Sequence, residues 1–157
     1  MIWEEMDKNL IVTNIEAQSP NDVFDILGQR FIDLGYSKDD YVIALKEREE
    51  QFPTGLDIMG FGVAIPHTDA GHVCKETVGI ATLKEGVRFI QMGSDDTEVM
   101  VKVVFMLGIK DPQSHIKKLQ QILCIIQDES VLSSIDLAKD SDEIIQLIKE
   151  KEMKIGG

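Results

Sequence analysis

Apolar residues recur along the chain with two different spacings, which predict an alternation of strands and helices. Short runs that are apolar, or that alternate with a period of two, predict strands. These runs are residues 10–15, 63–65, 78–83, 87–91 and 99–107. The run at 99–107 is almost entirely apolar, as expected at the centre of a sheet, whereas 87–91 predicts a short edge strand. Pro66 has no N–H for a central ladder, so the strand before it must end there.

Longer segments repeat apolar residues three or four positions apart and predict helices. They are residues 19–35, 38–51, 111–126, 130–135 and 141–151. Ser19 is the predicted N-cap of the first helix, Pro20 its first residue and Gly35 its stop signal. Helices that alternate with strands predict an α/β (α+β) fold. We expect a single domain over residues 1–157, with a mixed sheet that helices cover on both faces.

The charge of the chain limits the partners that it can bind. Its 157 residues include 16 Lys and Arg against 28 Asp and Glu, which gives a formal net charge of −12. The sequence has no basic patch, so we expect phosphate backbones and anionic lipid surfaces to repel it. This predicts no nucleic-acid partner and favours a protein partner with a basic docking face. The alternative is that the charge only keeps the protein soluble.

The apolar runs and the cysteines predict the compartment. No apolar run approaches the roughly 18–20 residues of a membrane-spanning helix, and no basic-then-apolar leader opens the chain. We therefore expect a cytoplasmic protein without membrane insertion, in which Cys74 and Cys124 are reduced thiols. Cys124 lies in an apolar run and is predicted to be buried.

His67 is the first candidate for chemistry. It follows a proline at the end of a predicted buried strand, and reacting groups collect at strand ends in covered sheets. The alternative is an ordinary histidine in a surface loop. A zinc site that includes His72 would lack a clear third ligand. The sequence contains no GxxxxGK[ST] loop, GxSxG elbow or GxGxxG fingerprint, and we expect no metal or nucleotide cofactor.

Arg48 is the second candidate. It falls on the stripe of its predicted helix that should turn inward, where a cation needs an anionic partner or a cleft. Beside His67, its guanidinium would steady a phosphoryl group in transfer. The alternative is a structural ion pair, for instance with Glu49, Glu50 or Asp57.

His115 is the third candidate. It lies in the first turn of its predicted helix, after the predicted cap Asp111. The positive end of a helix disfavours an imidazolium and favours a nearby anion, so a neutral His115 could donate a hydrogen bond to a phosphoryl oxygen. The alternative is a histidine of the core or its rim.

Three segments together resemble a known family. They are KEREEQFPTG at residues 46–55, GVAIPH at 62–67 and HIKKL at 115–119. Over nearly its whole length, the chain resembles the enzyme IIA domain of the fructose–mannitol class in the phosphoenolpyruvate-dependent sugar phosphotransferase system. The REEQFPTG stretch and the spacing from His67 to His72 look most like the galactitol-specific branch. The family fold is a mixed five-stranded sheet between helical layers.

The resemblance implies a role for each candidate residue. It makes His67 the phosphorylated residue, Arg48 the arginine beside it, and His115 the second histidine of many members. The implied phosphotransferase takes its phosphoryl group from the histidine-containing phosphocarrier protein and passes it to a sugar-specific IIB component, with a membrane IIC component involved only indirectly. Thr68 and Asp69 follow His67 where many members have a glycine, a departure that the galactitol branch shares.

The expected mechanism and its alternatives follow from these roles. Neutral His67 would attack the donor in line, Arg48 would offset the charge on the transferring group, and His115 would donate a hydrogen bond. A first alternative is a regulator in a nitrogen-related phosphotransferase branch, which binds targets according to its phosphorylation state. A second is an acidic interaction module in which His67 is inert.

Overall fold

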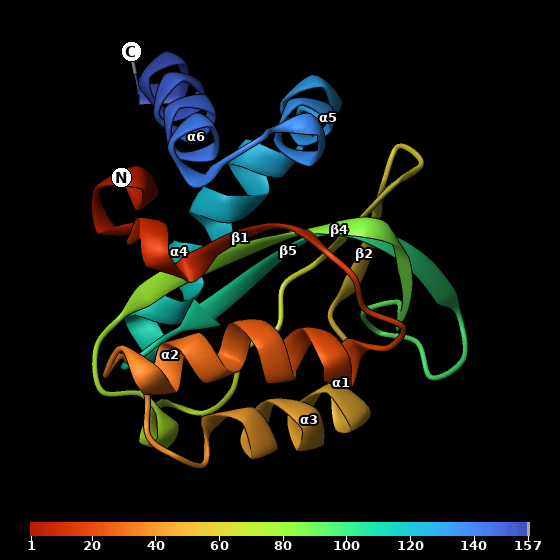
Figure 1. Cartoon of the computed structure of the whole chain (residues 1–157), viewed down its shortest axis with the longest axis vertical. Coiled ribbons are helices and arrows are strands. Elements are labelled where there is room, and N and C mark those ends of the chain that lie inside the picture. The colour runs from red at the N-terminus through yellow and green to blue at the C-terminus, as the bar shows by residue number, and fades with distance from the viewer. Residues whose placement is uncertain (157) are drawn as a thin grey trace.

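The computed structural model describes residues 1–156, which form a five-stranded mixed sheet between two helical layers (Figure 1). The strands are β1 (Ile11–Ile15), β2 (Gly55–Ile58), β3 (Phe61–Ala64), β4 (Thr77–Ile90) and β5 (Glu98–Gly108). Their order is β1-β4-β5-β3-β2; β1 is parallel to β4, β3 is parallel to β5, and the pairs β2–β3 and β4–β5 are antiparallel. The predicted fold class and the central place of β5 are confirmed.

The helices divide into two layers, with α1, α2 and α3 on one face of the sheet and α4, α5 and α6 on the other (Figure 1). They are α1 (Pro20–Val23), α2 (Gln29–Asp33), α3 (Tyr41–Gln51), α4 (Pro112–Ile126), α5 (Glu129–Leu137) and α6 (Ser141–Gly156). A π-helical turn, Phe24–Gly28, joins α1 to α2 within the predicted first helix, and 3₁₀ turns span Ile2–Glu5, Lys8–Leu10 and Ala70–His72.

Three predicted helix ends, at Ser19, Gly35 and Asp111, are confirmed by local geometry, whereas α3 begins at Tyr41 and not at Lys38, and α6 extends to Gly156 and not only to Lys151. Ser19 Oγ accepts a hydrogen bond from the backbone N–H of Asp22 at 3.3 Å, and Asp111 Oδ1 accepts one from the N–H of Ser114 at 2.9 Å. Gly35 follows α2 with a φ of 80°, a left-handed conformation that glycine adopts without strain. The caps fix where each helix starts, and the Asp111 cap places the first turn of α4.

The position of β5 at the centre of the sheet explains its almost continuous apolar sequence. Val103 and Phe105 pack against the layer of α4–α6, whereas Val104 and Met106 pack against the layer of α1–α3. Because both faces of β5 are buried from residue 103 to residue 108, polar residues are excluded from both sides of that part of the strand. None of the helices in residues 1–156 is long and apolar enough to cross a membrane.

The predicted edge strand at residues 87–91 is wrong. Val87 to Ile90 continue the long strand β4 and pair with Val101 to Glu98 of the central strand. The register shifts between Thr82 and Val87, so the polar residues there form an irregularity within one strand and only resemble a loop in sequence. The edge strand beside β3 is instead β2, which the sequence pattern did not predict.

The predicted burial of Cys124 is also wrong, because its side chain is exposed. On α4 the buried positions around it are Ile122, Ile125 and Ile126, and Cys124 falls between them on the outer side of the helix.

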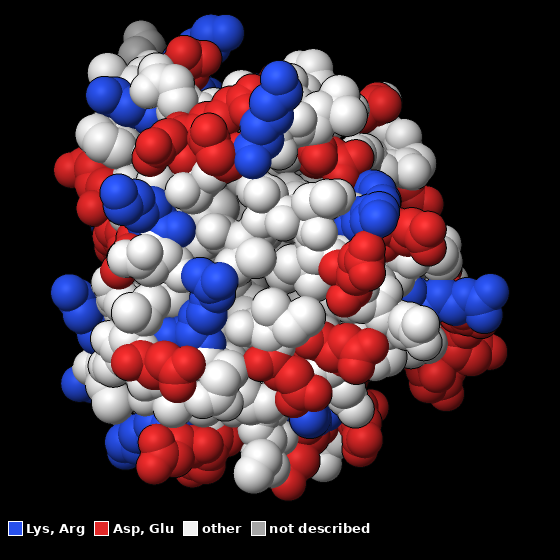
Figure 2. All heavy atoms as spheres, viewed as in Figure 1, with Lys and Arg blue, Asp and Glu red and all other residues white. Residues whose placement is uncertain are grey.

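Figure 2 shows the charged side chains on one face of the molecule. On that face, Asp and Glu side chains are interspersed with Lys and Arg around a largely uncharged centre.

Close backbone contact between β3 and β5 makes Gly62 a stringent test of this sheet. A Cβ at Gly62 would lie 1.8 Å from the backbone oxygen of Met100, so Gly62→Ala should lower the free energy of unfolding by at least about 2 kcal/mol. Gly71→Ala is the control, since no heavy atom of the described residues lies within 4 Å of a Cβ there, and its effect should stay within about 0.5 kcal/mol. Urea unfolding measures both, and equal stabilities would contradict the described register.

Candidate functional site

The candidate site forms where the chain leaves the sheet after β3. The carbonyl of Pro66 accepts a hydrogen bond from the N–H of Leu107 at 2.9 Å, which pins the chain to the end of β5. The N–H of Ile65 donates to the carbonyl of Thr54 at 3.2 Å, which ties the other side to the start of β2. His67 therefore lies at the ends of the inner strands β3 and β5, where α3 approaches from one layer and α4 from the other.

The ring of His67 is held in one tautomer by its own backbone. Its Nδ1 lies 2.9 Å from the carbonyl oxygen of Ile65, and because a carbonyl can only accept, Nδ1 must carry the proton. The lone pair of the ring is then on Nε2. Burial lowers the pKa of His67 below its ordinary value, the bond to Ile65 opposes this shift, and the neighbouring His115 and the charge of Arg48 lower the pKa further. The imidazole is thus neutral at pH 7, as a nucleophile must be.

His115 lies directly against His67. The two ring centroids are 4.7 Å apart and the ring planes meet at 67°, an edge-to-face arrangement. Burial, followed by the charge of Arg48, lowers the pKa of His115 and keeps this ring neutral too. Its Nε2 is buried and has no hydrogen-bond partner among the residues that the structure describes. That nitrogen is available to a group that enters the site.

Arg48 reaches the same site from the last turn of α3. Its guanidinium carbon lies 4.4 Å from the centroid of the Phe52 ring, and its Nη1 lies 3.4 Å from Oδ1 of Asp69. Its ion-pair partner is therefore Asp69, and the three acidic residues that the sequence suggested do not pair with it in the described part of the chain. Within residues 1–156, the buried Nε of Arg48 has no hydrogen-bond partner.

A partly buried carboxylate, which the sequence suggested only as an ion-pair partner of Arg48, connects these parts. Glu49 accepts two hydrogen bonds from Thr54, one from its N–H and one from its Oγ–H, both at 2.7 Å. Burial raises the pKa of Glu49, while the two bonds from Thr54 lower it. Because the Thr54 carbonyl in turn holds Ile65, this contact joins the end of α3 to the backbone that orients His67. In the sequence, this contact could have been suspected from the position of Glu49 next to Arg48 in the REEQFPTG stretch.

The loop after His67 is attached to the start of α3. Thr68 is buried, and the turn Ala70–His72 follows Asp69. His72 Nδ1 lies 2.9 Å from Oδ2 of Asp40, and this contact lowers the pKa of the Asp40 carboxyl. His72 is thus paired with the residue that caps the start of α3.

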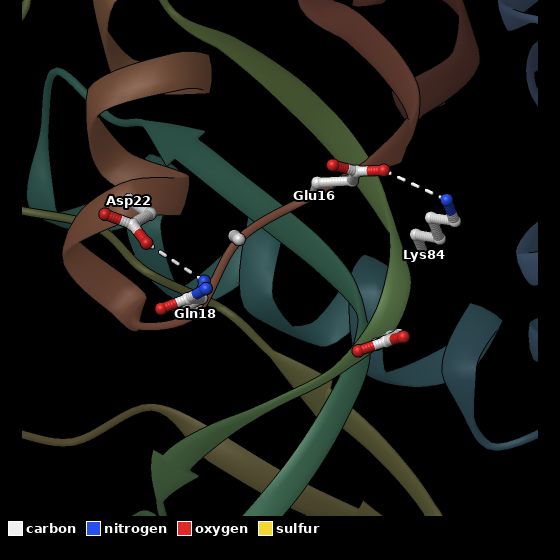
Figure 3. Close-up of a pocket in the computed structure, with 6 residues that line it drawn as sticks. Glu16, Gln18, Asp22 and Lys84 are labelled. Atoms are coloured by element: carbon white, nitrogen blue, oxygen red, sulfur yellow. Dashed lines mark hydrogen bonds and ion pairs between the residues drawn. The ribbon is translucent and has the colours of Figure 1, made fainter.

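A separate surface hollow lies at the end of β1 and the start of α1 (Figure 3). Its polar groups bind one another: Lys84 pairs with Glu16 at 2.9 Å, and the N–H of Gln18 donates to Asp22 at 2.9 Å. None of the three candidate residues lines this hollow. The three candidate residues lie instead around the chain that follows β3.

Comparison with known proteins identifies the family. Residues 4–151 match the model of the EIIA 2 family of the phosphoenolpyruvate-dependent sugar phosphotransferase system. The chain is 32% identical to a mannitol-specific enzyme IIA component of Staphylococcus aureus, over 90% of this chain and 93% of that protein. It is 28% identical to a galactitol-specific EIIA component of Escherichia coli, over 81% of this chain and 85% of that protein.

Solved structures share the fold. One is a complex of the mannitol enzyme IIA with a phosphorylated mannitol enzyme IIB from Escherichia coli, with a TM-score of 0.77, 23% identity and coverage of 92% of this chain and 97% of that one. Another is the nitrogen regulatory protein IIA-Ntr from Neisseria meningitidis, with a TM-score of 0.76, 24% identity and coverage of 94% and 98%. The family match defines the class of protein, a component of a sugar phosphotransferase system. The chain belongs to the EIIA 2 family of the phosphoenolpyruvate-dependent sugar phosphotransferase system.

The environment of His67 predicts its titration. An NMR titration should place its pKa below the ordinary value of 6.5 and show the proton of the neutral ring on Nδ1. The unfolded chain in urea is the control and should titrate near 6.5. Since the folded pKa is the lower one, the contribution of His67 to stability is complete above the unfolded pKa and falls as the pH drops through it. A folded pKa at or above 6.5, or a proton on Nε2, would contradict this geometry.

Proposed function

We propose that His67 carries the phosphoryl group and that its Nε2 is the nucleophile. The hydrogen bond from Nδ1 to the Ile65 carbonyl supports this most directly, since it leaves the lone pair on Nε2. Two buried nitrogens near this ring, Arg48 Nε and His115 Nε2, lack hydrogen-bond partners among the described residues. Buried polar atoms are seldom left unpaired, and a phosphoryl group offers several acceptor oxygens to both.

In the proposed step, Nε2 attacks the phosphorus of a phosphohistidine on the donor protein in line. The bond from phosphorus to the donor nitrogen breaks as the bond to Nε2 forms, and its electron pair returns to the donor ring. The positive charge that appears on the ring of His67 strengthens the bond from Nδ1–H to the Ile65 carbonyl. Arg48 and His115 face the charge on the equatorial oxygens. The step requires no metal and no nucleotide.

The proposed donor is the histidine-containing phosphocarrier protein, and the proposed acceptor is a sugar-specific IIB component. The Escherichia coli relative of this fold, which was solved with a phosphorylated enzyme IIB, supports that acceptor. In this relay the chain works in the cytoplasm and meets the membrane IIC component only through IIB. The acidic surface of the chain, with its formal net charge of −12, favours partners with basic docking faces.

The proposed sugar is galactitol or a related polyol. One relative is galactitol-specific and another is mannitol-specific, and both of these sugars are polyols. Two features of the galactitol-like stretches lie near His67: Phe52, which is 56% exposed, stacks on Arg48, and His72 ends the loop that begins at Thr68. Because a IIA protein does not touch the sugar, these side chains would act by selecting the IIB partner.

The regulatory role in a nitrogen-related branch shares the first step with transport. In both roles His67 accepts a phosphoryl group, but only the transport role requires fast transfer to a sugar-specific IIB. Genes for IIB and IIC components beside the gene for this chain would favour transport. Efficient acceptance by His67 without transfer to any IIB would favour the regulator.

Phosphorylation of His67 is tested by intact mass after incubation with phosphoenolpyruvate and the two general phosphotransferase proteins. The wild type should gain one phosphoryl group, and His67→Ala should gain none because the nucleophile is absent. His72→Ala is the matched control and should still be phosphorylated, since His72 is paired with Asp40. Phosphorylation of His67→Ala to the wild-type level, with a wild-type circular dichroism spectrum, would refute the proposed nucleophile.

The proposed sugar is tested by rates of transfer from the purified phospho-protein. Transfer should be faster to a galactitol-type IIB than to a mannitol-type or fructose-type IIB, because specificity is a difference between affinities and the surface around His67 contributes to it. Quenched-flow sampling of the phosphorylated IIB measures all three rates under the same conditions. Equal rates, or a preference for the fructose type, would refute galactitol while leaving the relay itself intact.

A further inference from the structure

A carboxylate already pairs with one nitrogen of the guanidinium that a phosphoryl group on His67 would contact. Nη1 of Arg48 lies 3.4 Å from Oδ1 of Asp69, and Asp69 follows His67 by only two positions. The side chains are 31% and 79% exposed, so solvent screens this ion pair and it adds little to the stability of the fold. Its importance lies in the charge that it brings to the site, where the carboxylate of Asp69 also opposes the lowering of the pKa of His67.

The backbone of Asp69 cannot carry this carboxylate away from the site. Before it, Thr68 is buried and His67 is held by its own backbone bond. After it, the N–H of His72 donates to the carbonyl of Asp69 at 3.2 Å, and His72 is in turn paired with Asp40 at 2.9 Å. Rotation of the Asp69 side chain is therefore the main freedom left, and its negative charge stays close enough to His67 to act on the pKa of that ring.

We infer that Asp69 is a positioning residue for Arg48 that weakens the hold of this carrier on its phosphoryl group and so favours transfer to the next protein. The inference rests on the proposed role of His67. When the bond from phosphorus to Nε2 forms and the donor bond breaks, the carboxylate of Asp69 competes with the phosphoryl oxygens for the Nη1 side of Arg48. The carboxylate also faces a group of like charge. Both effects raise the free energy of the phosphorylated state relative to the unphosphorylated one.

An equilibrium measurement separates this role from docking and from folding. Contacts with the donor protein change the rates of transfer, but they cancel in the equilibrium constant between the free proteins. A purely structural Asp69 would leave that constant unchanged in any variant that folds. Asp69→Asn is suited to the test because the side chain is exposed and the substitution preserves its shape while removing its charge.

The experiment mixes equimolar phosphorylated histidine-containing phosphocarrier protein with this chain and reads the final distribution of phosphate by intact mass. Asp69→Asn should shift the equilibrium toward the phosphorylated chain by about 3- to 30-fold, the range for one or two unit charges a few ångström apart in a solvated site. Asp142→Asn removes the same charge from α6, in the layer that does not contain α3, and should leave the equilibrium within about 2-fold of the wild type (Figure 1).

A double-mutant cycle with Arg48→Ala tests the proposed route of the effect. If Asp69 acts by competing for Arg48, Asp69→Asn should shift the equilibrium less in the Arg48→Ala background than in the wild type. An equilibrium constant for Asp69→Asn that equals the wild-type value, or that lies below it, would overturn the inference. So would an equally large shift with Asp142→Asn. A wild-type chain that accepts no phosphate would instead refute the proposed function.

Discussion

The site depends on the few hydrogen bonds that fix the chain as it leaves the sheet. Ile65 is held by Thr54, Pro66 is held by the last residues of β5, and the Ile65 carbonyl then orients the ring of His67. These bonds involve backbone groups that are buried, where an unpaired donor or acceptor is expensive, so the geometry is strongly favoured. The proposed nucleophile is thereby positioned by the sheet and needs no separate buried carboxylate to select its tautomer.

Sequence patterns predicted the parts of the fold that depend on local preference or on burial over a long run. Ser19, Asp111 and Gly35 mark helix ends through contacts within a few residues, and the apolar run of β5 reflects burial on both faces. The failures share a different cause. Strand β2 is only four residues long, and the interruption inside β4 has the composition of a turn, so both are determined by pairing with neighbouring strands.

The candidate residues could be predicted, whereas most of their partners could not. His67, Arg48 and His115 were apparent from their positions relative to Pro66, the stripe of α3 and the start of α4. Their proximity depends on how the two helical layers come together at the ends of the inner strands β3 and β5. The contact between Arg48 and Asp69 joins residues 21 positions apart, and no local periodicity indicates it. The two bonds between Glu49 and Thr54 span a helix end, a proline and a strand start, and were missed for the same reason.

Electrostatics in this molecule oppose the retention of a phosphoryl group at long range and favour it only at short range. A formal net charge of −12 raises the free energy of any added anion, although salt weakens this effect beyond about 8–10 Å. Close to His67, the guanidinium of Arg48 and the nitrogen of His115 that has no partner within the described residues act in the opposite direction. Asp69 takes part in both effects, since it belongs to the acidic surface and also contacts Arg48 in the site. A phosphoryl carrier must release the phosphoryl group as readily as it accepts it. A balance between long-range repulsion and short-range attraction keeps both directions of transfer accessible.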